Sequence, residues 1–271
     1  MNGRSLHALI NQTEVGTLQE VNGLWSFKYS EAWLDDGQHF ALSPHLPLTA
    51  EAQLDGATRR PVQWYFDNLL PEEGQRRLLA NDARLDAADA FGLLACYGAE
   101  SAGSITLLPP EAEVPSDAAL CPLPDSALEE RIRQLPRTPL THAAIKRMSL
   151  AGAQHKLAVV LRDDALFEPA GSTPSTHILK PDHPDDDYPH SVINEWFVMR
   201  LAKRLGLDVP EVHPPYVPSP VYLINRFDRV HGETGWQRRH VIDACQLLGL
   251  DRSFKYSQGS MENLAALANA C

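Results

Sequence analysis

The chain has 271 residues, of which 44% are hydrophobic and 22% charged, a composition typical of a soluble globular protein with one large domain or two smaller ones. Its formal net charge of −11 and the lack of a long basic run argue against direct binding to nucleic acid. No stretch approaches the roughly 18 apolar residues of a membrane-spanning helix, and no secretory signal opens the chain, so we expect a cytoplasmic protein without membrane contact.

Residues 1–108 have the pattern of a small α+β unit. Short apolar runs predict strands at 6–10, 14–18, 24–29 and 104–108, and helical spacing predicts helices at 62–70, 74–80 and 87–95. Asn22-Gly23 predicts a tight hairpin turn, because both residues tolerate a positive φ.

Residues 109–139 are predicted to be a linker that ends in a short helix at 125–135. Five prolines crowd the stretch up to residue 124. Proline fixes φ and removes a backbone donor, so we expect neither a helix nor a central strand in the stretch before the helix.

Residues 140–271 form the second predicted unit. Strands are expected at 155–161, 176–180, 212–217 and 220–225, a long helix at 191–205, and the opening of another helix at Ser260. The four cysteines, at 96, 121, 245 and 271, lack the close spacing of a zinc site and fit a reducing cytosol, and we name no metal ligand in the chain.

A turn of small residues, Ala151-Gly152-Ala153, precedes the first strand of the second unit, and Lys180 ends the next strand. Glu195 follows after 15 residues, about one turn into the long helix. Loop, strand, lysine and helix glutamate follow the order of parts that hold ATP phosphates in kinase-like folds. An ordinary turn, a solvated lysine and an acid at a helix N-terminus would give the same pattern.

A longer pattern resembles the HipA-type serine/threonine kinase toxins. It includes the run Ser149-Leu150-Ala151-Gly152-Ala153-Gln154-His155-Lys156 and extends over nearly the whole chain. The other similar segments are 15–18, 27–29, 33–34, 46–48, 66–71, 101–107, 173–180, 194–195, 201–207, 226–229, 243–246 and 254–256. The resemblance implies a small N-terminal α+β module followed by a kinase-like N-lobe with an antiparallel sheet and one main helix.

The resemblance implies a role for each residue of the phosphate site. Ala151, Gly152, Ala153 and Gln154 would lie over the phosphates of ATP, and Lys180 would hold them with Glu195 as its partner. Ser149 matches the serine that such kinases autophosphorylate, which ejects the phosphate loop, since a dianionic group there would repel ATP.

The segment 224–228 would form the hinge that reads the adenine. Phe227 could lie against the purine or belong to the core, and Asp228 could accept a hydrogen bond from ribose or pair with a neighbouring arginine. Asn225 stands where the family often has a glutamate, so it can accept a hydrogen bond but brings no charge.

Kinase chemistry also needs an aspartate that orients the substrate hydroxyl and an asparagine five residues later that binds Mg²⁺. No aspartate in this sequence is followed by asparagine at that distance. The family's run, Asp-Gly-His-x-Lys-Asn, belongs to its helical C-lobe, so we expect a chain truncated before that lobe, with no catalytic residue of its own and no phosphotransfer activity.

The resemblance implies a protein kinase toxin of a toxin–antitoxin system that uses ATP and Mg²⁺. Its partners would be a HipB-like antitoxin, through which alone it would contact DNA, and a protein substrate such as an aminoacyl-tRNA synthetase. The alternative is a non-catalytic module whose first unit docks an antitoxin or a partner kinase chain.

Overall fold

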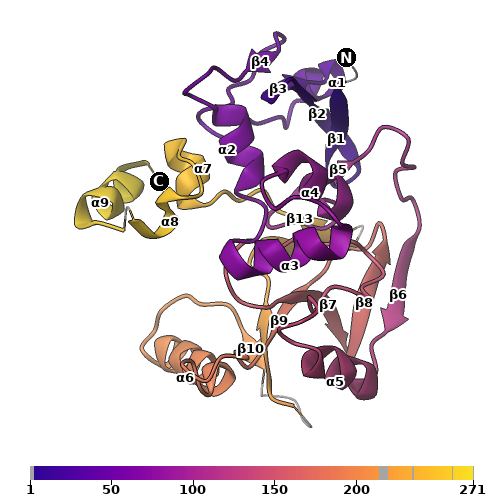
Figure 1. Ribbon diagram of the computed structural model, residues 1–271, viewed down its shortest axis with the longest axis vertical. Helices are drawn as coiled ribbons and strands as arrows, with labels where there is room; N and C mark the ends of the chain where they lie inside the picture. The colour runs from indigo at the N-terminus through magenta and orange to yellow at the C-terminus, as the bar shows by residue number, and fades with distance from the viewer. Residues whose placement is uncertain (1–2, 214–218, 234, 258, 271) are drawn as a thin grey trace.

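The first unit is a five-stranded antiparallel sheet with helices packed on it. The computed structural model describes residues 3–213, 219–233, 235–257 and 259–270 (Figure 1). The sheet has the order β4-β3-β2-β1-β5. Its strands and helices are β1 Arg4–Ile10, β2 Thr13–Val21, β3 Leu24–Tyr29, α1 Glu31–Asp35, β4 Gln53–Leu54, α2 Pro61–Asp67, α3 Glu73–Ala83, α4 Ala90–Tyr97 and β5 Ile105–Leu108.

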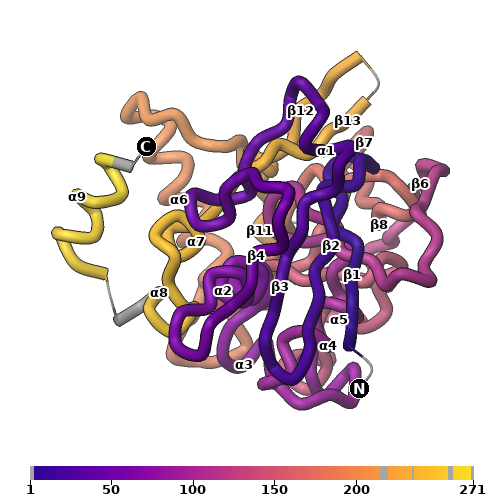
Figure 2. Tube along the Cα trace, turned by 90° about the horizontal axis from the view of Figure 1, so that it is seen from above, coloured from indigo at the N-terminus to yellow at the C-terminus, as the bar shows by residue number. Residues whose placement is uncertain are grey.

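Alternation along β3 shows why this sheet has one buried face. Trp25, Phe27 and Tyr29 are buried, while the residues between them point the other way, as a strand's period of two requires. Phe66 of α2 packs on Phe27, with ring centroids 5.4 Å apart. The predicted Asn22-Gly23 hairpin is confirmed, because both residues have positive φ between β2 and β3, which Figure 2 shows lying side by side.

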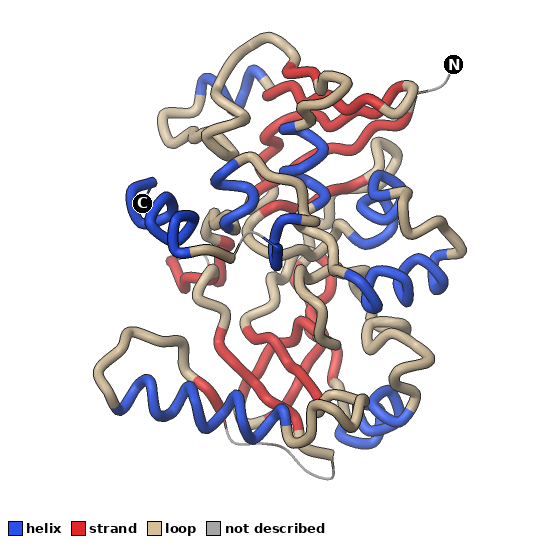
Figure 3. The backbone as a smooth tube through the Cα atoms, turned by 60° about the vertical axis from the view of Figure 1, so that its left-hand side comes forward, coloured by secondary structure: helices blue, strands red, loops and turns tan. Residues whose placement is uncertain are grey.

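The second unit is a six-stranded antiparallel sheet in the order β10-β11-β9-β7-β8-β6. The predicted antiparallel sheet with one main helix is therefore present, and that helix lies along one side of it (Figure 3). Residues 214–217 of one predicted strand lie outside the described residues. The elements are β6 Ala118–Pro122, α5 Asp125–Arg133, β7 Leu157–Arg162, β8 Ala165–Gly171, β9 His177–Pro181, α6 Ser191–Arg204, β10 Val212–His213 and β11 Val221–Asn225.

Two strands of this sheet were not expected from the sequence. The proline-rich linker was predicted to hold neither a helix nor a central strand, and the strand that it does form, β6, pairs with β8 at the edge of the sheet. As the edge strand it tolerates Pro122, since one side of an edge strand needs no backbone donor. β8 follows β7 through a tight turn in which Asp163 and Asp164 both have positive φ.

After β11 the chain returns to the first unit. A two-stranded ribbon, β12 Arg229–Gly232 and β13 Gly235–Arg238, leads into α7 Ala244–Leu248, α8 Phe254–Ser257 and α9 Met261–Ala270. Gln246 completes a capping box with Asp243 at the start of α7, and its Nε2 donates to the Tyr65 carbonyl of α2 at 2.8 Å. The predicted serine start of the last helix is confirmed, because Ser260 Oγ accepts from the Asn263 backbone N–H.

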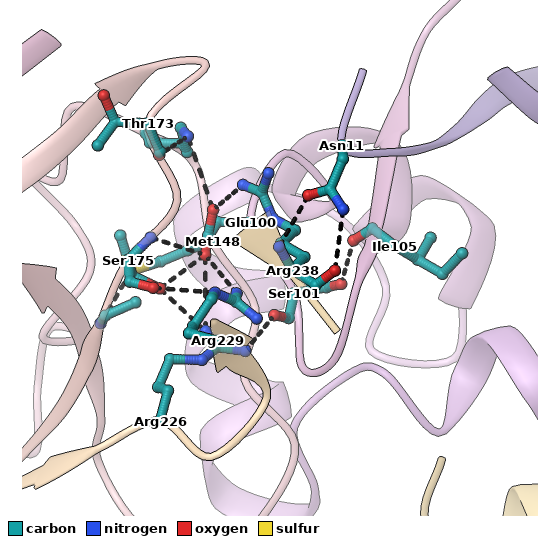
Figure 4. A network of polar contacts seen from close by, with 12 residues as sticks. Asn11, Glu100, Ser101, Ile105, Met148, Thr173, Ser175, Arg226, Arg229 and Arg238 are labelled. Atoms are coloured by element: carbon teal, nitrogen blue, oxygen red, sulfur yellow. Dashed lines mark hydrogen bonds and ion pairs between the residues drawn. The ribbon is translucent and has the colours of Figure 1, made fainter. Parts of the chain in front are cut away.

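A buried carboxylate, Glu100, joins the two units (Figure 4). Its oxygens lie 2.6 Å from Arg238 Nη2, 3.0 Å from Arg229 Nη2 and 3.5 Å from Arg226 Nη1. They also accept from the Ser175 hydroxyl at 2.7 Å. Burial alone would raise the pKa of Glu100, but the surrounding cations outweigh it and hold the pKa well below its usual value.

Replacing Glu100 by glutamine leaves several buried cations without their counter-charge. We expect Glu100→Gln to lower the free energy of unfolding by about 3–5 kcal/mol, measured by urea denaturation. The matched control is Glu51→Gln, whose side chain is exposed and for which we expect less than about 0.5 kcal/mol. Equal stability of the two variants would contradict this assignment.

Candidate functional site

Lys180 and Glu195 form an ion pair on the wall of a cavity. Lys180 Nζ donates to Glu195 Oε2 at 2.7 Å, which joins the end of β9 to the second turn of α6. The lysine side chain is 20% exposed, and its Nζ lies 5.6 Å from the centre of the Tyr222 ring. The carboxylate and the ring hold the amine at one position instead of leaving it in bulk solvent.

The cavity has a volume of about 680 Å³, within the usual range for a ligand site. Both units contribute to it. Its lining residues are Asn68, Leu69, Ala102, Gly103, Leu150, Ala151, Lys156, Ile178, Lys180, Asn194, Glu195, Val198, Met199, Tyr222, Ile224, Asn225, Arg226, Phe227, Asp228, Val241, Ile242, Asp243 and Gln246.

The small-residue loop forms one edge of this cavity. Gly152 has a φ of +108°, which side chains rarely adopt, so glycine is needed at this bend. The loop is attached to the first unit through a parallel bridge between Pro71 and Gly152. The Glu72 backbone N–H also donates to the Gly152 carbonyl at 3.4 Å.

Lys156 is the site residue that sequence reasoning missed. Its Nζ donates to the Ala151 carbonyl at 2.9 Å, so the loop wraps around this amine, and a Cβ at Gly152 would collide with it. Burial, together with the nearby charge of Lys180, lowers the pKa of Lys156 to about 8. The available signal was a lysine four residues after Gly152, but the pattern at this position predicted only the start of a strand.

The four loop residues predicted to lie over the phosphates line three different cavities. Ala151 lines the 680 Å³ cavity together with Lys180 and Glu195. Gly152 lines a neighbouring cavity of about 480 Å³ beside α7. Ala153 and Gln154 line a third, of about 1100 Å³, on the side of the acidic loop that follows β9. The loop therefore separates these cavities, and Ala151 is its one residue that lines the same cavity as Lys180, while Glu195 also lines the third cavity with Ala153 and Gln154.

The three predicted hinge residues all line the 680 Å³ cavity. Phe227 is 68% exposed, so the reading of Phe227 as a core residue is wrong. Asn225 Oδ1 lies 2.8 Å from His213 Nε2, so this amide oxygen already has a partner.

Asp228 belongs to the buried ionic cluster, where Arg226 Nε and Nη2 donate to its two oxygens at 2.9 and 2.7 Å. Burial would raise the pKa of Asp228, but these hydrogen bonds and the charges of Arg226 and Arg229 lower it instead. Of the two predictions for Asp228, the geometry thus favours a pair with arginine over a hydrogen bond from ribose.

Ser149 is only 1% exposed. Its backbone N–H donates to the Glu100 carbonyl at 2.9 Å, while its hydroxyl has no hydrogen-bond partner among the described residues. The hydroxyl therefore forms no hydrogen bond that would cap or stabilise the turn. A phosphate could be added to it only if this segment left its place.

Searches against known proteins find the same family at both ends of the chain. The HipA N-terminal domain family matches residues 6–108, and the HipA-like C-terminal domain family matches residues 148–271. The expectation that the C-terminal lobe is absent is therefore not supported, because the second unit itself matches that domain. Within the described residues, no helix is long and apolar enough to cross a bilayer.

Individual proteins are also similar to this chain in sequence or in structure. The chain is 40% identical to the protein Y4mE of Sinorhizobium fredii over 250 residues, which are 88% of this chain and 57% of that protein. It is 34% identical to the serine/threonine-protein kinase toxin HipA of Shewanella oneidensis, over 85% of this chain and 51% of that one. A solved complex of Shewanella oneidensis HipA, HipB and operator DNA contains a chain that superposes with a TM-score of 0.72 at 29% identity, covering 95% of this chain and 60% of that one.

The chain thus spans between half and 60% of the length of these relatives. Both units match domains of one family in the order in which that family carries them. The chain belongs to the HipA family.

Proposed function

We propose that residues 1–271 supply the ATP-binding part of a HipA-like serine/threonine kinase of a toxin–antitoxin system. The observation that carries this proposal is the pairing of Lys180 with Glu195 at a cavity that a second lysine, Lys156, also lines. Around Lys180, two ammonium groups and one carboxylate leave an excess of one positive charge, while Asp228 and Asp243, which also line the cavity, pair with Arg226 and Lys255.

Each lining segment has a task in this proposal. The amines of Lys156 and Lys180 bind the phosphates below Ala151, and Glu195 orients Lys180. The adenine lies toward the hinge, where exposed Phe227 offers a ring for stacking. Mg²⁺ would accompany ATP. The activity that these residues supply in this proposal is the binding of ATP.

The proposal extends to partners and regulation. The Shewanella oneidensis relative was solved with HipB and operator DNA. We propose that a HipB-like antitoxin binds the kinase containing this chain and makes its DNA contacts, in keeping with the net charge of −11. The substrate would be a protein serine, and an aminoacyl-tRNA synthetase remains our candidate. Autophosphorylation of Ser149 would keep the loop out of its place, because the site is too closed for a phosphate.

The Lys180 assignment is tested by titrating ATP into the chain and following the heat of binding. We expect Lys180→Met to weaken ATP binding at least about tenfold, which corresponds to about 1.4 kcal/mol, because a charge-assisted contact is lost. The matched control is Lys203→Met, which removes an exposed lysine from the last turn of α6. Equal affinities of the two variants would contradict the assignment, and no ATP binding by the unchanged chain would favour the docking-module alternative.

The Lys156 assignment predicts that ATP binding takes up protons. Near pH 8.5 a large part of this amine is neutral, since its pKa is about 8, and neighbouring phosphates favour the ammonium form and raise that pKa. Calorimetry in two buffers of different ionisation enthalpy should show the uptake in the unchanged chain. It should disappear in Lys156→Arg, whose guanidinium is always charged. Uptake that persists in this variant would refute the assignment.

The loop geometry predicts different effects of alanine at two glycines. Gly152 and Gly206 both have positive φ, at +108° and +83°, so both substitutions strain the backbone. Only at Gly152 would the new Cβ meet Lys156, whereas nothing lies near Gly206. We expect Gly152→Ala to weaken ATP binding several-fold and Gly206→Ala to leave it unchanged. The reverse order would show that the loop does not contact ATP.

A further inference from the structure

A separate cavity of about 300 Å³ lies between the first unit and the segment that leads to Ser149. Three cationic side chains line it, those of Lys146, Arg147 and Arg238, and no carboxylate is among its described lining residues. It shares no lining residue with the 680 Å³ cavity. A cationic cavity is unexpected in a chain with a net charge of −11.

The buried ionic cluster beside this cavity has more positive than negative charge. Its four cations are Lys146, Arg226, Arg229 and Arg238, and its two carboxylates are Glu100 and Asp228. Four positive and two negative charges leave an excess of two among the described residues. Burial, with the charges of Arg238 and Arg229, outweighs the opposite effect of Glu100 and lowers the pKa of Lys146 to about 8.

The cations nearest the cavity have donors to spare. Lys146 is 8% exposed, and its Nζ donates to the Thr173 carbonyl at 2.7 Å but lies 3.6 Å from Glu100. Arg238 is 9% exposed and, among the contacts of the described residues, donates from its guanidinium only through Nη2, to Glu100 (Figure 4). Arg147 lies at the more open end, where its side chain is about half exposed and pairs with Asp82 at 3.3 Å.

We propose that this cavity binds a small oxyanion, namely a phosphate group, through Lys146, Arg147 and Arg238. Guanidinium and ammonium groups are the usual partners of phosphate, and a dianion would balance the excess of two charges. The group could be inorganic phosphate or the phosphate of a small monoester, since the chemistry at these donors is the same. The site is independent of ATP binding, because its residues lie outside the nucleotide cavity.

The test is calorimetric titration of the nucleotide-free chain at constant ionic strength, with inorganic phosphate in one arm and glycerol 3-phosphate in the other. Four proteins are compared: the unchanged chain, Lys146→Met, Arg147→Met and the control Lys203→Met. Lys146→Met removes a surplus charge, and Arg147 is on the surface, so we expect both variants to fold. Circular dichroism spectra of both variants, compared with that of the unchanged chain, check that they fold.

We expect one site whose affinity is reduced at least tenfold in Lys146→Met and Arg147→Met and unchanged in the control, whereas phosphate bound in the nucleotide cavity would keep the same affinity in all four proteins. Binding in the first arm alone would indicate inorganic phosphate, and tighter binding in the second would indicate a monoester, and either outcome supports the site. The absence of binding to the unchanged chain, or equal affinity in all four proteins, would overturn the proposal.

Discussion

The buried carboxylate of Glu100 is the contact on which the arrangement of this protein depends. It belongs to the first unit, yet its oxygens contact Arg226 within the predicted hinge, Arg238 of β13 and Ser175 before β9. Its backbone carbonyl accepts from the Ser149 N–H, at the base of the phosphate loop. One residue therefore sets where the loop, the hinge and the lysine strand begin, and the cavity among them exists because these segments are held together.

Local charge, not overall charge, explains how an acidic protein could hold a triphosphate. Glu195 balances Lys180, but Lys156 contacts only a neutral carbonyl oxygen, and burial together with Lys180 lowers its pKa to about 8. No carboxylate of the described part of the chain forms an ion pair with this amine, although Glu72 and Glu195 raise its pKa from farther away. ATP phosphates would supply an anionic partner, and the resulting change in protonation would couple nucleotide binding to the loop that wraps around Lys156.

The sequence predicted the parts of the site that depend on local order along the chain. Strand, lysine and helix glutamate could be placed by spacing, which left a solvated lysine as an alternative, and the resemblance to the kinase family implied the Lys180–Glu195 contact that the structure has. Contacts between distant segments could not be predicted. Nothing near Glu100 indicates that arginines more than 100 residues away would surround it, and nothing near Gln246 indicates that α7 returns to Tyr65. The edge strand β6 was missed because the prolines in and around it oppose a strand, and its place at the edge of the sheet makes Pro122 tolerable.

The central claim is that a nucleoside triphosphate lies with its phosphates between Lys156 and Lys180, below Ala151. A crystal structure of this chain with a non-hydrolysable ATP analogue and Mg²⁺ tests it most directly. The account predicts phosphate oxygens within hydrogen-bond distance of both amines and the adenine beside Phe227. Phosphates bound in another cavity, with Lys180 still paired only to Glu195, would contradict it.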